Sequence, residues 1–174
     1  MLGGAARALM ERVSYVDFFA RVLDVVPGEV PHEGGVLWMD AVVRPFTPRL
    51  LFPGKSNIDD SVSTRKYTGL NIAGSEAATT ITIGYPAESY VDFGPWLMMF
   101  PIGVLGWGLG RFYRWMVNYR YSRGIVGEAL ATAVVFQSLF LETSLAKLIG
   151  GQVLAILISW IMARWVLSTV SALR

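Results

Sequence analysis

The sequence contains no cysteine and only one histidine, His32, among its 174 residues. Without cysteine the chain forms no disulfide and has no thiolate nucleophile, and a single histidine excludes a histidine-rich metal site within the chain. Acidic residues are scarce in the second half: residues 95–174 hold seven Lys and Arg against two Asp and Glu, whereas residues 1–94 hold eight against eleven. The chain therefore joins a polar first part to a strongly apolar second part.

Several familiar catalytic motifs are also missing. The sequence has no GxxxxGK[ST], no GxSxG, no HExxH and no GxGxxG after a strand pattern, so nothing supports nucleotide-driven or zinc chemistry. Nucleic-acid binding lacks support as well, because the basic residues of the second half cluster in one short loop between apolar runs. We expect no cofactor, no metal and no nucleic-acid partner.

Three long apolar runs follow residue 94, at about 96–111, 125–141 and 148–166. Each is close to the roughly 20 residues that cross a bilayer as a helix. The sequence therefore predicts an all-α integral membrane protein. In it, residues 1–94 form a region of amphipathic helices and irregular loops, and residues 95–174 form three transmembrane helices.

Positive charge predicts the orientation of these helices. The connection between the first two runs carries four arginines and no acid: Arg111, Arg114, Arg120 and Arg123. Such loops stay in the cytoplasm, so we expect residues 1–94 on the outer side of a bacterial inner membrane, facing the periplasm or exterior. Because the N-terminus lacks a secretory signal, we expect the chain to be part of a longer polytopic bundle with further transmembrane helices as partners.

The first part contains patterns of several helices. Apolar residues recur at helical spacing over about 5–26, and Pro27-Gly28 ends that pattern. A short apolar helix is expected over about 36–43, before Pro45 and Pro48. Residues 57–61 offer N-caps for a helix over about 62–67, which Gly69 ends.

Cations lie on a proline-stiffened segment, at Arg44, Arg49 and Lys55, and again at Arg65 and Lys66. They predict either binding of an anionic ligand or contact with lipid phosphates and internal carboxylates. His32 lies in a turn-rich link, where a lone histidine is usually a solvated surface residue and otherwise a proton acceptor or a donor to phosphate.

The order of these motifs carries a resemblance. The succession RPFTPRLLFPGK (44–55), KYTG (66–69), GYPAESYVDFG (84–94) and a glycine-rich span ending in an arginine-aromatic cluster resembles the C-terminal part of the O-antigen polymerase-like family. That family consists of bacterial polysaccharide polymerases. The resemblance implies polymerisation of undecaprenyl-pyrophosphate-linked oligosaccharide repeat units, a glycosyl transfer outside the cytoplasm.

It also implies roles for particular residues. Arginine and lysine stabilise the leaving pyrophosphate, and the expected residues are Arg49 and Arg65, then Arg44, Lys55 and Lys66. The attacking sugar hydroxyl needs a proton acceptor, for which Glu88, Asp92 and His32 are the choices. Tyr67 and Tyr90 are expected to stack on or hydrogen-bond the sugars. The partners implied are a lipid-linked oligosaccharide and the bilayer.

Two other functions remain open at this point. A non-catalytic membrane subunit of a polysaccharide assembly complex would use the same charged region to bind protein. A membrane-bound glycosidase would use Glu88 and Asp92 as its carboxyl pair, since an i,i+4 spacing on a helix holds two carboxyls close together. The surplus of arginine and lysine beside proline has no role in hydrolysis, which favours the polymerase.

Overall fold

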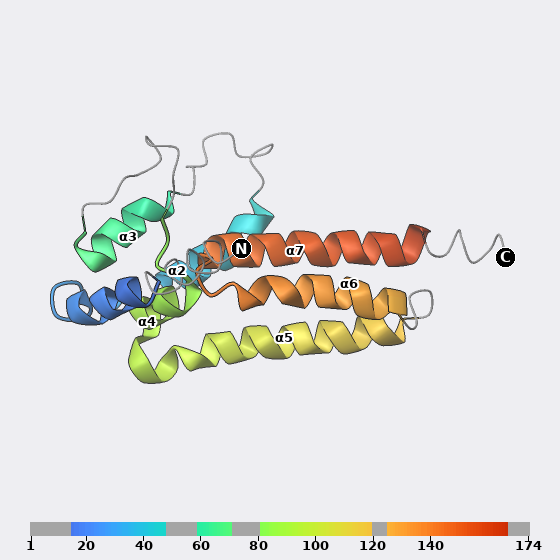
Figure 1. Ribbon diagram of the computed structural model, residues 1–174, viewed down its shortest axis with the longest axis horizontal. Helices are drawn as coiled ribbons and strands as arrows, with labels where there is room; N and C mark the ends of the chain where they lie inside the picture. Colours follow the sequence, from blue (N-terminus) through green and yellow to red (C-terminus); the bar gives the residue numbers. More distant parts are fainter. Residues whose placement is uncertain (1–14, 48–58, 71–80, 120–124, 167–174) are drawn as a thin grey trace, which may run out of the picture.

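The computed structural model describes residues 15–47, 59–70, 81–119 and 125–166. Within these ranges the chain forms helices joined by turns and contains no strand, so the predicted all-α fold class is confirmed for them. Figure 1 shows the long helices α5 (Met99–Asn118), α6 (Ile125–Phe136) and α7 (Leu145–Ile161) running side by side, with shorter helices gathered at one end. We call that group the cap. It comprises the helix over residues 15–25 with α2 (Val36–Val43), α3 (Asp60–Thr68) and α4 (Tyr85–Leu97).

Two cap helices lie where the sequence predicts them. Helix α2 spans Val36–Val43, and α3 spans Asp60–Thr68. The side chain of Asp59 caps α3 by accepting the Ser61 N–H at 3.1 Å. Gly69 ends the helix in a left-handed conformation, with φ 66°, which glycine adopts without steric cost. Both predicted helices are confirmed.

A sharp bend separates the cap from the first long helix. Helix α4 (Tyr85–Leu97) and helix α5 (Met99–Asn118) meet at 111°. Within α4, Gly94 has φ 74° and Pro95 has no N–H to donate, so the helical ladder is already interrupted there. This interruption falls just before the expected start of the first apolar run at Trp96, and α5 continues past the expected end at Arg111 to Asn118.

The remaining long helices are α6 (Ile125–Phe136), extended by a 3₁₀ turn at Gln137–Leu139, and α7 (Leu145–Ile161), extended by a π-helical turn at Met162–Val166. Helix α6 lies between α5 and α7 (Figure 1). By length and composition, the helix over Leu145–Trp165 could cross a bilayer, and α4 with α5 would qualify together as one bent span. The three-span arrangement stays a prediction, because the apolar helix over Ile125–Leu139 is shorter.

Three apolar clusters hold these elements together. Val22, Val26, Ile83 and Val91 are buried within the cap, and Tyr67 of α3 packs with them. Ala41, Tyr85 and Leu145 are buried in a second cluster that joins α2, α4 and α7. Met116, Ala131 and Ala163 form the third, which joins the long helices at the end away from the cap. The cap is therefore packed onto the beginning of α7.

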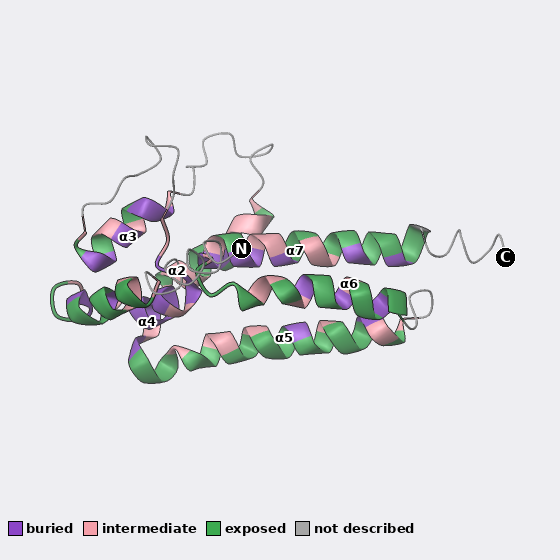
Figure 2. Ribbon diagram, viewed as in Figure 1, coloured by how far each residue is buried: buried purple, intermediate pink, exposed green. Residues whose placement is uncertain are grey.

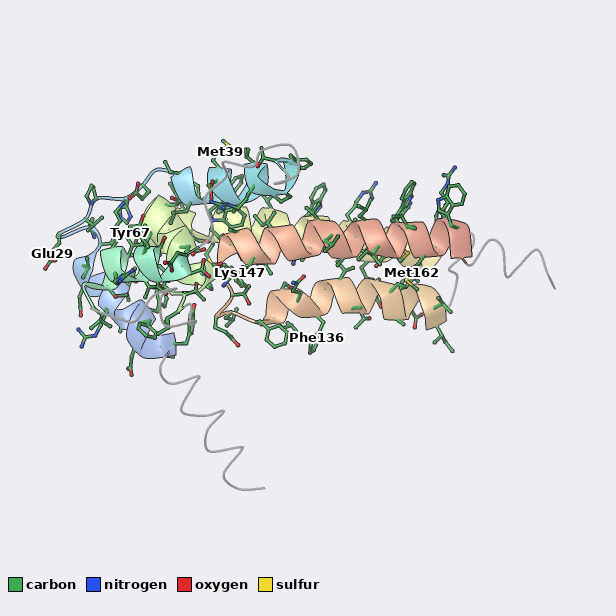
Figure 3. The ribbon with its side chains drawn as sticks, turned by 90° about the horizontal axis from the view of Figure 1, so that it is seen from above. Glu29, Met39, Tyr67, Phe136, Lys147 and Met162 are labelled. Atoms are coloured by element: carbon green, nitrogen blue, oxygen red, sulfur yellow. The ribbon has the colours of Figure 1, made fainter. Side chains whose placement is uncertain are left out.

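The outer surfaces of the long helices are exposed and apolar. Figure 2 shows exposed residues covering most of their outward sides, while buried residues gather in the cap. Trp107 is 72% exposed and Phe136 is 55% exposed. In Figure 3, Phe136 projects from α6 on the side away from α7. Exposed apolar surface of this extent is typical of a face that contacts lipid or other protein.

Candidate functional site

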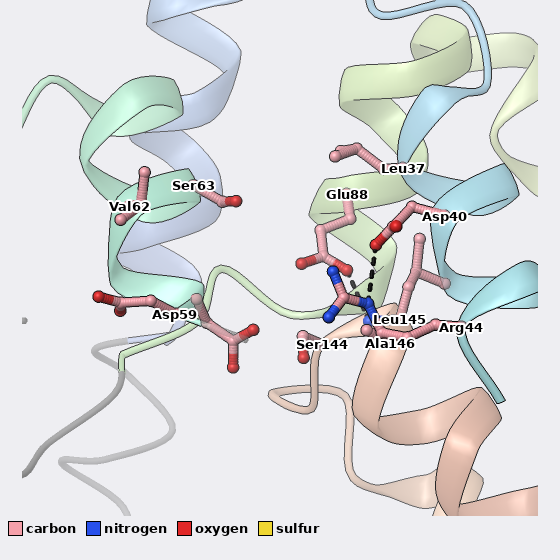
Figure 4. Close-up of a pocket in the computed structure, with 11 residues that line it drawn as sticks. Leu37, Asp40, Arg44, Asp59, Val62, Ser63, Glu88, Ser144, Leu145 and Ala146 are labelled. Carbon is pink, nitrogen blue, oxygen red and sulfur yellow. Dashed lines mark hydrogen bonds and ion pairs between the residues drawn. The ribbon is translucent and has the colours of Figure 1, made fainter. Parts of the chain in front are cut away.

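A pocket of about 280 Å³ lies where the cap meets the beginning of α7 (Figure 4). Helices α2 and α3 form its two sides, and α4 and the first turn of α7 lie behind it. Seven of its eleven lining residues are polar or charged. The lining residues are Leu37, Asp40, Arg44, Asp59, Asp60, Val62, Ser63, Glu88, Ser144, Leu145 and Ala146.

Glu88 joins the pocket to helix α7. Its side chain is buried, and one carboxyl oxygen accepts the backbone N–H of Leu145 at 2.6 Å. Ser144, the N-cap residue of α7, makes no side-chain capping bond, so the carboxyl from α4 performs that role. A helix N-terminus favours an acceptor there because its first N–H groups lack intrahelical partners. In Figure 4 the other oxygen of Glu88 points toward the α3 side of the pocket.

Burial changes the acidity of Glu88. Loss of hydration raises its pKa to about 8, and the nearby carboxylates of Asp60 and Asp92 act in the same direction. The Leu145 N–H and the Lys147 ammonium oppose this rise without cancelling it. A carboxyl with a pKa of about 8 is mainly protonated at neutral pH, unlike an exposed glutamate.

Ion pairs on the pocket's rim connect its elements. The Lys147 ammonium of α7 lies 2.6 Å from a carboxylate oxygen of buried Asp60 on α3. Across the pocket, Arg44 Nε donates to Asp40 at 3.0 Å. Carboxylates outnumber cations in the lining, which suits a ligand that offers hydrogen-bond donors. Among the described residues no group of three or more His, Cys, Asp and Glu could hold a metal ion.

Asp92 lies one turn after Glu88 on α4 but serves another helix. Its two carboxylate oxygens accept the N–H groups of Leu37 at 3.1 Å and of Trp38 at 2.8 Å. Beside it, Ser89 accepts the Trp38 indole N–H at 2.9 Å. Burial raises the pKa of Asp92, and these backbone N–H groups lower it in part. Asp92 thus caps α2, outside the lining of the pocket.

Lys66 and Tyr67 meet at a different carboxylate. Lys66 Nζ and the Tyr67 hydroxyl both donate to Glu33, the hydroxyl at 3.0 Å. Burial raises the pKa of Tyr67 to about 12, and the Lys66 hydrogen bond lowers the pKa of Glu33. The cluster fastens α3 to the link before α2. The structure therefore brings these two residues together, but not at the pocket.

His32 and Tyr90 also pack together. The imidazole Nδ1 donates to the Val91 carbonyl at 3.1 Å, and the ring meets Tyr90 edge-on at 5.5 Å. The Tyr90 hydroxyl is buried and donates to the Val26 carbonyl at 2.9 Å. His32 is half-buried rather than fully solvated. Both residues therefore belong to the packing of the cap.

The predicted cations are spread over the chain. Arg44 lines the pocket, and Arg65 lies in the last turn of α3. Arg49 and Lys55 lie outside the described residues. Of all the expected site residues, the pocket unites Arg44 and Glu88.

The sequence pattern predicts no chemical role for the other polar residues of the pocket. It marks Asp59 and Asp60 as N-cap residues, and it contains no motif at Ser63 and Ser144 of the lining or at Lys147 on the rim. The Thr143-Ser144 pair, directly before an apolar run, was a helix-start signal that could have drawn attention to this edge.

Comparison with known proteins places the chain in a family. No curated protein and no solved structure matches it. A family model matches residues 6–171, a range that includes every helix described above. The cap and the long helices are therefore parts of one family unit. Over residues 6–171 the chain belongs to the family described as a domain of unknown function, DUF8712.

Proposed function

We propose that this protein takes part in polymerising undecaprenyl-pyrophosphate-linked oligosaccharide repeat units into a surface polysaccharide, by glycosyl transfer at the outer face of a bacterial inner membrane. The single observation that carries the proposal is the pocket between the cap and α7, which contains a buried carboxyl with a pKa of about 8. The order of motifs from residue 44 to residue 94 supports the same chemistry through its resemblance to O-antigen polymerase-like proteins.

The pocket would take the acceptor sugar. Its carboxylates, at Asp40, Asp59 and Asp60, are acceptors for sugar hydroxyls. In the proposed reaction, ionised Glu88 removes the proton from one hydroxyl, whose oxygen attacks the anomeric carbon of the growing chain. The bond from that carbon to the lipid pyrophosphate breaks, and the pyrophosphate leaves with the electron pair.

The leaving pyrophosphate needs positive charge. An acid-rich pocket is unfavourable for it, so we place it at the pocket's edge, near Arg44 and toward Arg65 of α3. Arg49 and Lys55 keep their proposed roles from the sequence. Bidentate guanidinium groups suit phosphate oxygens better than ammonium groups do.

Glu88→Gln tests this role. The glutamine amide oxygen can still accept the Leu145 N–H, so the variant keeps the hydrogen bond at the N-terminus of α7 but cannot exchange a proton. In membrane vesicles that supply lipid-linked repeats, we expect polymer formation to fall by roughly 10²- to 10⁴-fold, with single units accumulating on a gel. Glu142→Gln is the matched control, because Glu142 is exposed and lies outside the pocket lining.

A second function has an observation in its favour. Glu88 and Asp92 each hold the first turn of another helix, which is a sufficient structural reason for both carboxyls. The protein would then be a non-catalytic membrane subunit of a polysaccharide assembly complex. Wild-type polymer lengths from Glu88→Gln would support that function and exclude Glu88 as the base.

A further inference from the structure

A second pocket, of about 590 Å³, lies on α5 near its C-terminal end, far from the cap. Its lining comes from the last turns of α5 and from Tyr119, the residue after them, and the four helical residues share one face because they recur at intervals of three and four. These residues are Arg111, Arg114, Trp115, Asn118 and Tyr119. Two guanidinium groups and two aromatic rings therefore surround one open hollow.

The two arginines are available to a ligand. Both are exposed, and neither forms an ion pair with a carboxylate among the described residues. The surroundings are ordered: Trp115 packs on Tyr119 with ring centroids 5.1 Å apart, and the Asn118 amide donates to the Arg114 carbonyl at 2.7 Å. The two guanidinium groups therefore lie beside a packed pair of aromatic rings.

The depth of this face matters if α5 spans a membrane. From Met99 to Gly110 the helix carries no charge, a rise of about 18 Å. The hydrocarbon core of a bilayer is about 30 Å thick. With the cap at one surface, Arg111 and Arg114 would lie short of the opposite headgroups, and their side chains must extend to phosphate or draw phosphate inward.

We propose that Arg111 and Arg114 together bind the phosphate of an anionic phospholipid, in the leaflet opposite the cap. Paired guanidinium groups match phosphate oxygens in charge and geometry. Trp115 and Tyr119 are amphipathic rings of the kind that lie at the headgroup level, against the glycerol and upper acyl chain. The site rests on the membrane placement used in the proposed function, but not on glycosyl transfer.

Lipid retention measures this site directly. The full chain is purified in detergent, mixed with phosphatidylglycerol or phosphatidylcholine, and analysed by native mass spectrometry. We expect preferential retention of phosphatidylglycerol, reduced roughly fivefold for each arginine changed in Arg111→Gln and Arg114→Gln. Arg164→Gln is the control, since Arg164 lies at the same end of the long helices but stacks over Trp160, at 5.7 Å from the ring centroid. It should retain phosphatidylglycerol as the wild type does.

Three results would overturn the site. If Arg164→Gln loses as much phosphatidylglycerol as the Arg111 and Arg114 variants, retention depends only on general surface charge. If both lipids are retained equally, the site does not select by headgroup charge. If inorganic phosphate displaces the lipid, the site binds a soluble anion. Failure of the proposed function looks different: lipid selectivity would persist while polymer formation ignored Glu88→Gln. A chain that retains no lipid and fails to float with vesicles would refute the membrane placement and this site together.

Discussion

Glu88 and Asp92 show how one turn of a helix can organise the cap. They lie four residues apart on α4, and the sequence alone makes them a plausible carboxyl pair for hydrolysis. In the structure they serve separate helices, Glu88 at the start of α7 and Asp92 at the start of α2. Each carboxyl has its own backbone donors, so the geometry gives no support to a shared glycosidase site.

The raised pKa of Glu88 predicts a pH-dependent stability. Its pKa is about 8 when folded against an ordinary value of 4.5, so the folded state holds the proton more tightly. The stabilisation is complete below about pH 4.5 and is lost as the pH rises toward 8, with a slope of at most about 1.4 kcal/mol per pH unit. The free energy of unfolding, measured by urea titration with circular dichroism in micelles, should fall more steeply in wild type than in Glu88→Gln. Asp92 is present in both proteins, so its contribution to the pH dependence cancels in the comparison. Parallel pH profiles of the two proteins would contradict the raised pKa of Glu88.

Local signals in the sequence predict the helix ends whose hydrogen-bond partners lie nearby in the chain. Asp59 bonds to Ser61 two residues away, and Gly69 closes the same helix. The hydrogen bond from the Leu145 N–H to Glu88 at the start of α7 is not predictable in this way. The two residues are 57 positions apart, and only the packing of α4 on α7 brings them together. A sequence pattern identifies a carboxylate but not the distant donor that it meets.

At the scale of elements, the join before α4 is the tightest in the cap. Gly84 has φ 82°, and an added Cβ would overlap the Leu141 carbonyl oxygen and the ring of Tyr15. The next residue reinforces the join, since the Tyr85 N–H donates to the Thr143 carbonyl at 2.8 Å. A side chain at residue 84 would therefore separate α4 from the connection between α6 and α7.

A matched pair of alanine variants tests this crowding. Gly69 also has a positive φ, 66°, but nothing lies within 4 Å of an added Cβ. Gly69→Ala should lower the free energy of unfolding by about 1 to 2 kcal/mol, from backbone strain alone. Gly84→Ala should cost roughly 1 to 3 kcal/mol more, because overpacking adds to the same strain. If both variants lose the same free energy of unfolding in urea titrations, the chain around residue 84 accommodates the added Cβ without a further loss of stability.

Periodicity and turn residues predicted the elements better than their angles. The helix over Val36–Val43 has the predicted bounds. The sequence marks an interruption at Gly94-Pro95, where the backbone is non-helical, but it gives no value for the 111° angle between α4 and α5. The bend keeps the cap beside the beginning of α7 instead of in line with α5.

The whole molecule has two ends of different character. The cap lies at one end of the long helices, and the C-terminal end of α5 lies at the other (Figure 1). The acid-rich pocket belongs to the first end, and the arginine-aromatic face of α5 belongs to the second. A membrane protein with its cationic face in the cytoplasm would have this polarity. The topology is therefore the property on which the proposed function depends most.

The absence of cysteine makes that topology directly measurable. The parent chain has no background thiol, so single substitutions report one position each. We expect Glu142→Cys, at an exposed position beside the cap, to react with an impermeant maleimide added outside intact cells, and Asn118→Cys, at the opposite end of α5, to react only after the membrane is opened. Labelling of both from one side would mean that the long helices do not span the bilayer. Reversed labelling would put the pocket in the cytoplasm, where lipid-linked repeats displayed outside could not reach Glu88.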